Sequence, residues 1–136
     1  METAAVRSDL DLTLVGAEVP VILTASLEYR ASDPYAVAVV FFTADGPVRW
    51  VFARDLLDEG LVHEVGEGDV QVAPVRDAFG DTVVQLRLAS PDGVAVLEAP
   101  ADAVLDFLAR SYGHVPPGRE ADYLDLDEVL GALLAD

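Results

Sequence analysis

The chain contains neither cysteine nor lysine. Without cysteine, disulfide bonds and thiolate metal sites are excluded. Because there is no lysine, eight arginines are the basic residues that offset 25 aspartates and glutamates, and the formal net charge is −17. Nucleic acids and anionic lipid surfaces repel a chain of this charge. We therefore expect no nucleic-acid partner.

Long hydrophobic runs are absent too. The longest, Ala36 to Phe42, falls short of the roughly 18–20 residues that span a bilayer. No basic flank precedes an apolar segment near the N-terminus, so no signal peptide is expected. These absences predict a soluble cytoplasmic protein without direct membrane insertion, whose membrane contact goes through a protein partner.

A length of 136 residues fits one domain. Such a chain buries about 68–70% of the surface that its unfolded form exposes, which suffices for a hydrophobic core. We expect residues 1–8 to form a flexible tail and residues 9–136 to form the single domain.

Two neighbouring segments show contrasting strand patterns. Residues 21–30 alternate apolar and polar side chains, as a half-buried strand does. Residues 36–42 are apolar on both faces, which is typical of a strand covered on both sides. In a small domain a second copy of the chain can supply that cover. The sequence therefore predicts a homo-oligomer whose contact uses Val37, Val39, Val40, Phe41 and Phe42.

The remaining pattern predicts an α+β fold with a largely antiparallel sheet of about seven strands. A short helix over residues 53–59 interrupts the strands and ends at Gly60. Two helices follow the last strand. One carries an apolar stripe from Ala101 to Tyr112 and ends before Gly113, and the other begins near Asp125.

No residue pattern predicts catalysis. His63 and His114 are the only histidines, and neither stands in a metal-binding spacing. The chain has no Gly-x-Ser-x-Gly nucleophile motif. His63 beside Glu64 could be a base and its orienting group, but a loop histidine next to a solvated glutamate is the commoner case. We expect no catalytic residue, metal or cofactor, and a hydrolase using His63 or His114 stands as the alternative.

Four acidic residues crowd the C-terminal region: Asp122, Asp125, Asp127 and Glu128. Their spacing differs from that of a calcium-binding loop. Acidic residues at a helix start cap its N–H groups and favour its dipole, and this role is the simpler interpretation. The second interpretation is an acidic docking surface for a partner protein.

Aromatic residues on the expected strands could stack on nucleic-acid bases. Tyr35, Phe41, Phe42 and Trp50 are the residues concerned. With few arginines beside them, packing in the core or between subunits is favoured.

Motifs spread along residues 10–134 resemble the SsgA-like protein family of sporulating actinomycetes. They are Leu27-Glu28-Tyr29-Arg30, Asp33-Pro34-Tyr35-Ala36-Val37, Trp50-Val51-Phe52-Ala53-Arg54-Asp55-Leu56-Leu57, Gly66, Gly68-Asp69-Val70, Pro74, Ser90-Pro91, Gly93, Leu97-Glu98-Ala99-Pro100, Phe107-Leu108, Val115-Pro116-Pro117-Gly118-Arg119-Glu120 and Leu124-Asp125-Leu126-Asp127. No single motif is a catalytic signature, and the resemblance depends on their order and spacing.

The resemblance implies a non-enzymatic protein that marks septum sites in sporulating cells and recruits the tubulin-like GTPase FtsZ. It implies work with the SsgA paralogue, a place at the division septum, a strongly bent sheet of the Whirly-like type and assembly as a homotrimer. Whirly-like proteins bind single-stranded nucleic acid, so a nucleic-acid-binding module is the alternative function. The charge of −17 disfavours that alternative, and a fold does not carry its function with it.

Overall fold

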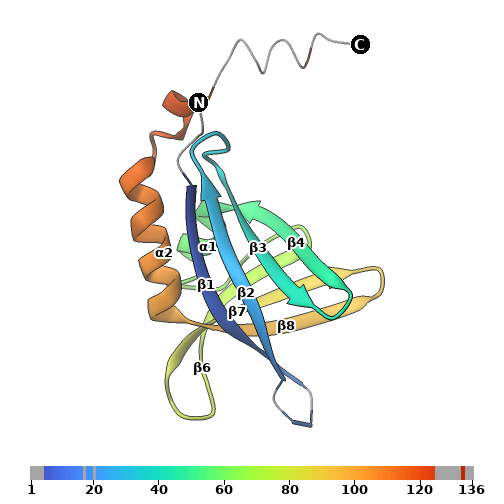
Figure 1. The fold of residues 1–136 in the computed structure, drawn as a ribbon. Coiled ribbons are helices and arrows are strands. Elements are labelled where there is room, and N and C mark those ends of the chain that lie inside the picture. Colours follow the sequence, from blue (N-terminus) through green and yellow to red (C-terminus); the bar gives the residue numbers. More distant parts are fainter. Residues whose placement is uncertain (1–4, 17, 20, 125–132, 134–136) are drawn as a thin grey trace.

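A computed structural model describes residues 5–16, 18–19, 21–124 and 133. Eight strands and two α-helices make up most of this part of the chain (Figure 1). The first half is β1 (Ala5–Leu14), β2 (Val21–Arg30), β3 (Ala36–Thr43), β4 (Gly46–Ala53) and α1 (Arg54–Glu59). The second half is β5 (Val65–Glu67), β6 (Val70–Arg76), β7 (Thr82–Ser90), β8 (Gly93–Pro100) and α2 (Ala101–His114). A short 3-10 helix, η1, covers Glu120–Tyr123.

The strands form one antiparallel sheet in the order β4-β3-β2-β1-β8-β7-β6-β5. Each half of the chain is thus a run of neighbouring hairpins, and β1 joins the halves by pairing with β8. That joint is narrow, since it has two residue pairs, Thr13 with Glu98 and Leu14 with Leu97. The sheet curls so strongly that it resembles a half-open barrel, and its two edges are β4 and β5 (Figure 1).

The concave face of the sheet carries the core. Alternate residues of β2 and β3 face inward, including Leu27 and Val39, which pair across the two strands and are at most 2% exposed. Helix α2 lies along β1 and contributes Phe107 and Leu108, which are also buried (Figure 1). Burying each of these large side chains contributes about 1.5–3 kcal/mol, so α2 is held firmly to the sheet.

The α+β class, the antiparallel sheet, its bend and the short inserted helix are confirmed. The expectation of about seven strands was low by one, and the structure has a short strand of three residues around Gly66, β5. Helix α2 passes through Gly113 to His114, since glycine with a helical φ continues a helix instead of ending it. The last predicted helix, beginning near Asp125, lies outside the described residues except for Leu133.

Residues 5–8 correct the expected N-terminal tail. They belong to β1, where Ala5 pairs with Arg30 and Ser8 pairs with Leu27. The alternation of Val6 with polar neighbours is the strand pattern that was missed, and Val6 is buried in the core. Residues 1–4 lie outside the described part of the chain.

The predicted oligomer contact on β3 is largely wrong. Val37, Val39 and Phe41 point into the core, with exposures of 1%, 0% and 5%. Val40, on the other face, is also buried, at 8%, and this cover comes from the protomer itself. Of the five predicted contact residues, Phe42 alone is exposed, at 43%.

Candidate functional site

A fully buried arginine ties the two halves of the chain together. Arg54 starts α1 and is 0% exposed. Its Nη1 donates hydrogen bonds to the Val115 carbonyl oxygen at 2.8 Å and to the Ser111 hydroxyl at 3.3 Å. Its Nη2 forms an ion pair with Oε2 of Glu120 at 3.2 Å. Burying an arginine is costly unless its charge is paired, and Glu120 supplies that pairing, while Nε of Arg54 has no hydrogen-bond partner within the described residues.

Two aromatic rings enclose the same guanidinium. Its central carbon lies 4.7 Å from the ring centre of Tyr29 on β2 and 4.7 Å from that of Tyr112 on α2. Cation–π attraction of this kind is worth about 2 kcal/mol or more when water is excluded. Arg54 therefore holds β2, α1, α2 and η1 in one cluster, which we call the arginine cluster (Tyr29, Arg54, Ser111, Tyr112, Val115 and Glu120).

The surroundings shift the titration of three members of the arginine cluster. Hydrogen bonding from its own backbone N–H lowers the pKa of Glu120, burial opposes this, and Arg54 lowers it further. Burial raises the pKa of Tyr29, although Arg54 opposes that change. Burial likewise raises the pKa of Tyr112. The carboxylate thus stays charged and the phenols stay neutral at neutral pH, which suits a structural cluster.

The Asp33-Pro34 corner between β2 and β3 is fastened to the arginine cluster. The Tyr29 hydroxyl donates a hydrogen bond to the Pro34 carbonyl oxygen at 2.9 Å. The next carbonyl, that of Tyr35, accepts a bond of 2.7 Å from the backbone N–H of Arg54. The corner motif and the Trp50–Leu57 motif, which carry much of the family resemblance, therefore meet in space.

Sequence reasoning included Arg54 in a family motif but assigned it no role. The available signal was an arginine immediately after a strand of mostly apolar residues and before the buried pair Leu56 and Leu57. Its partners Ser111 and Glu120 lie far along the chain, so no local pattern could identify them.

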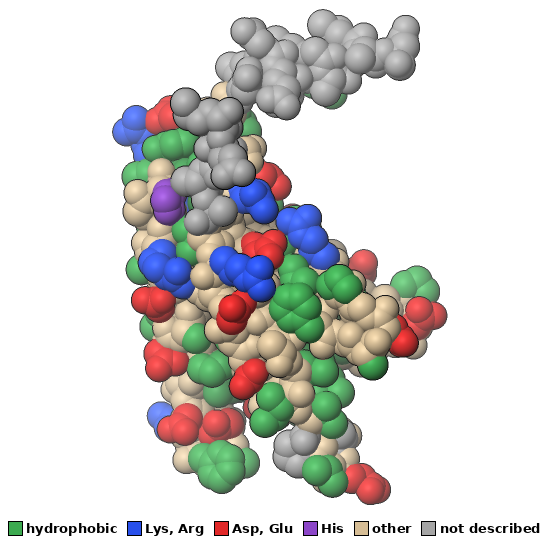
Figure 2. Space-filling model, in the orientation of Figure 1, with side chains coloured by type: hydrophobic (Ala, Val, Ile, Leu, Met, Phe, Trp, Pro, Cys, Tyr) green, Lys and Arg blue, Asp and Glu red, His purple; other side chains and the backbone are tan. Residues whose placement is uncertain are grey.

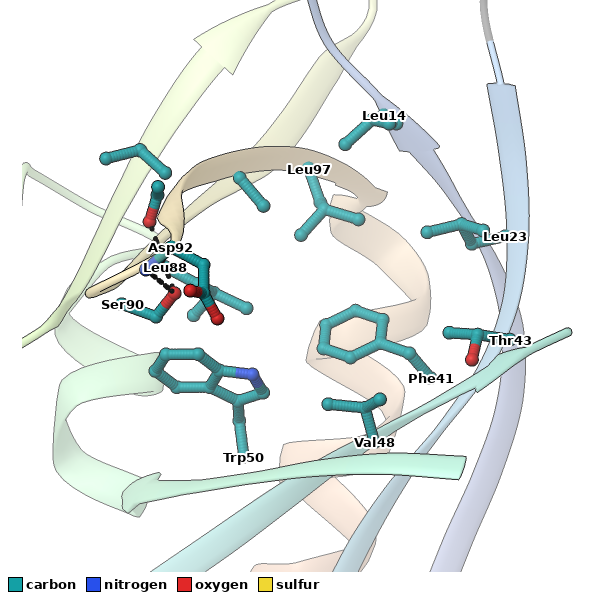
Figure 3. Close-up of a pocket in the computed structure, with 13 residues that line it drawn as sticks. Leu14, Leu23, Phe41, Thr43, Val48, Trp50, Leu88, Ser90, Asp92 and Leu97 are labelled. Atoms are coloured by element: carbon teal, nitrogen blue, oxygen red, sulfur yellow. Dashed lines mark hydrogen bonds between the residues drawn. The ribbon is translucent and has the colours of Figure 1, made fainter. Parts of the chain in front are cut away.

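The open end of the half-barrel forms an apolar groove. Val48 and Trp50 of β4 and Phe41 of β3 project toward Leu88 and Leu97 on the opposite strands (Figure 3). The groove encloses about 350 Å³ and has Ser90 and Asp92 on its rim. Pockets of this size and apolar character bind ligands or partner side chains.

A second, smaller cavity lies along the same edge strand. It encloses about 220 Å³ and is lined by β4 residues from Trp50 to Ala53, by Leu56 of α1, and by Glu67, Asp69 and Val70. Trp50 lines both cavities. The second cavity has residues of both sheet edges in its lining, from Trp50 to Ala53 of β4 and Glu67 of β5, and we call the space that it occupies the β4–β5 gap.

The outer face of the first four strands mixes charges of both signs. Figure 2 shows basic side chains interleaved with acidic and apolar ones on the face that it presents. On β1, Arg7 pairs with Asp9 at 3.0 Å, and on the neighbouring helix α2, Arg110 pairs with Asp106 at 3.1 Å. Pairing of this kind weakens any attraction to a phosphate backbone.

The predicted docking residues are described only in part. Asp122 lies on η1, is exposed and pairs with Arg119 at 2.6 Å. Asp125, Asp127 and Glu128 lie outside the described residues. The role of this acidic set therefore remains a prediction.

His63 and His114, the residues of the hydrolase alternative, lie on different elements of the fold. His63 is in an exposed loop after α1, with its ring Nδ1 3.2 Å from the Glu64 carbonyl oxygen. His114 is the last residue of α2. Among the residues that the structure describes, no three His, Asp or Glu side chains gather as a metal site would need.

No helix in the described part of the chain has the length and apolar character to cross a membrane.

Sequence comparison identifies relatives along most of the chain. The family model described as "Streptomyces sporulation and cell division protein, SsgA" matches residues 23–120. The sporulation-specific cell division protein SsgB of Kineococcus radiotolerans is 52% identical over 124 residues, covering 90% of this chain and 74% of that protein. SsgB of Streptomyces coelicolor is 48% identical over 133 residues and covers 96% of both chains.

Solved structures agree with the sequence comparison. A solved structure described as "Mutations in SsgB correlate to longitudinal cell division during sporulation of Streptomyces coelicolor" superposes with a TM-score of 0.84 at 46% identity, covering 90% of this chain and 98% of that one. An SsgA-like sporulation-specific cell division protein from Thermobifida fusca superposes with a TM-score of 0.86 at 38% identity over 98% of both chains. The chain therefore belongs to the SsgA family of sporulation and cell division proteins, within which its relatives are of the SsgB type.

Proposed function

We propose that the protein marks septum sites during sporulation and recruits or positions FtsZ there, without catalysing a reaction. The observation that carries the proposal is the 48% identity to an SsgB over 96% of both chains. Relatives this similar over their full length share a fold and, in general, a cellular role. The FtsZ step comes from the family resemblance, and the SsgA paralogue is a second proposed partner.

The polar residues that the fold buries support an adaptor in place of an enzyme. Arg54, Ser111 and Glu120 bond to one another and to backbone groups inside the protein, and of their buried side-chain donors Nε of Arg54 alone has no partner within the described residues. The apolar groove, by contrast, opens to solvent and is lined almost wholly by hydrocarbon side chains. Such a surface suits binding better than chemistry.

We also propose that the protein assembles as a homotrimer, has a Whirly-like fold and acts in the cytoplasm at the division septum. The order of four strands, a helix, four strands and a helix supports the fold proposal. Nucleic-acid binding does not follow from it, because the charge is −17. Light scattering at micromolar protein concentration tests the trimer, and a single-protomer mass would refute it.

A pull-down with purified FtsZ and SsgA tests the proposed function. We expect the protein to retain FtsZ, and to lose it when Asp122, Asp125 and Asp127 are all changed to arginine. If the protein neither bound FtsZ nor altered the assembly of FtsZ filaments, the proposal would be refuted.

A matched control separates a docking surface from total charge. Asp11, Asp45 and Asp81 are exposed acids on other parts of the sheet. Changing these three to arginine alters the net charge by the same amount, so FtsZ binding should survive. Equal loss in both triple variants would show that net charge, and not the acidic C-terminal set, controls binding.

A further inference from the structure

The edge strand β4 has unused backbone hydrogen-bonding groups. Within the described residues β4 pairs with β3 alone. Pro47, which has no N–H, faces Phe42, so this position cannot be a fully hydrogen-bonded pair. Bonded and non-bonded pairs alternate along antiparallel strands. The N–H and C=O groups of Arg49 and Val51 therefore point away from β3, toward the β4–β5 gap.

The inner side of β4 offers sites for alternate side chains of an added strand. Trp50 lines both the apolar groove and the second cavity, and Val48 also lines the groove. A strand laid against β4 would turn every second side chain to this inner side. Its apolar residues would enter the two cavities, while its remaining residues would face solvent.

Acidic residues line both cavities. Glu67 and Asp69 lie at the second cavity and Asp92 lies at the groove, and all three are exposed. These carboxylates would repel an acidic segment and attract lysine or arginine. The net charge of −17 on the whole chain likewise attracts basic segments and repels acidic ones.

We propose that the β4–β5 gap binds an extended segment of a partner protein, which adds to β4 as a further strand. The segment alternates apolar residues, which enter the two cavities that Trp50 lines, with basic residues, which stay on the solvent side near the exposed carboxylates of Glu67, Asp69 and Asp92. Strand addition at a free edge is a general mode of peptide recognition, in which backbone bonds give affinity and pockets give specificity. The partner need not be FtsZ, so this site goes beyond the proposed function.

A random library of displayed decapeptides, selected against the full-length protein, tests the proposal. We expect enrichment of sequences in which apolar residues alternate with lysine or arginine. On binding such a peptide, the amide protons of Arg49 and Val51 should become protected from exchange with solvent. Failure to enrich any peptide, or enrichment of acidic or non-alternating sequences, would overturn the proposal.

Two substitutions at one position provide the sharpest comparison. Val51→Pro removes an outward N–H, which an edge strand tolerates. Val51→Ala keeps that N–H and shortens a side chain that is 51% exposed. The selected peptide should bind Val51→Pro at least about fivefold more weakly and Val51→Ala within about twofold of the unchanged protein. Equal binding by Val51→Pro would contradict strand addition.

Charge reversal gives a second test that leaves the edge backbone intact. The double variant Glu67→Arg with Asp69→Arg should weaken peptide binding by at least about fivefold, since it replaces attraction by repulsion. Asp11→Arg with Asp81→Arg is the control and should change binding by less than about twofold. If Val51→Pro instead dissociated an oligomer of the protein, the occupant would be a second copy and the proposal would be wrong.

Discussion

The guanidinium of Arg54 and the carboxylate of Glu120 form an ion pair of 3.2 Å in which the two side chains are 1% and 7% exposed, although 66 positions separate them. The pair links the start of α1 to the 3-10 helix that follows α2. The charges offset one another, and each would be costly to bury alone.

Arg54→Met should lower the free energy of unfolding by about 3–5 kcal/mol, because it leaves the Glu120 carboxylate buried without its partner. It also removes the donors to Ser111 and Val115. Chemical denaturation followed by the fluorescence of Trp50 measures the change.

The double variant Arg54→Met with Glu120→Met is the control for the Arg54 prediction. Replacing both charges by apolar groups removes the unpaired carboxylate, so the double variant should be more stable than Arg54→Met alone. A double variant whose loss equalled the sum of the two single losses would contradict coupling between the residues.

Glu120 should make stability depend on pH in the acid range. Its pKa in the folded protein lies below the ordinary value of 4.5. The carboxylate therefore stabilises the fold fully above about pH 4.5, and this contribution is lost as the pH falls toward the folded pKa. The stability difference between the unchanged protein and Glu120→Gln should be constant near neutral pH and should shrink below pH 4.5. Urea midpoints from pH 7 to pH 3.5 measure it, and a gap that widened on acidification would have the wrong sign.

Tyr29→Phe should cost about 1–3 kcal/mol. The substitution leaves the Pro34 carbonyl oxygen without its 2.9 Å hydrogen bond in a buried setting. Tyr35→Phe is the matched control, because the Tyr35 side chain is 49% exposed and should lose less than about 0.5 kcal/mol. Thermal unfolding distinguishes the two, and equal shifts would show that the corner does not depend on this bond.

Gly60→Ala should destabilise the protein by about 1–3 kcal/mol through overpacking. A Cβ at this position would clash with Cγ1 of Val72, a core residue with 0% exposure. The added methyl group must therefore push β6 or α1 away. Thermal unfolding should show a lower midpoint.

Gly113→Ala should have the opposite effect. Gly113 lies inside α2, its φ is not positive, and a Cβ there would have no atom within 4 Å. Alanine in a helix interior is favoured over glycine by about 0.5–1 kcal/mol, so the midpoint should rise. A fall would show that α2 ends before Gly113 in solution.

Period-two alternation predicted most of the sheet because the concave face is buried and the outer face is largely polar. The same pattern predicted β2 with its observed bounds, Val21–Arg30. At β3 the interpretation of the pattern was wrong, because apolar residues on both faces suggested that a second subunit covers one of them. Val40 of that strand is small enough for its neighbours in the same protomer to cover it.

The arginine cluster could not be predicted in full from local patterns, since its members come from β2, α1, α2 and η1. Arg54 was part of a family motif without an assigned role, and Glu120 looked like any other acid in a chain with 25 of them. The β4–β5 gap was hidden for a related reason. Which strands become sheet edges depends on β1 pairing with β8, and no periodicity encodes that choice.

The narrow joint between β1 and β8 also affects how the chain is made. Strands β1 to β4 leave the ribosome first and can form their hairpins at once, since each pairs with its neighbour in sequence. The partner of β1 on its other side, β8, is the last strand to be synthesised. An uncovered strand edge invites pairing with other chains. The nascent protein therefore has an unpaired edge on β1, able to pair with other chains, until Leu97 and Glu98 of β8 emerge. In the completed fold β8 covers this edge.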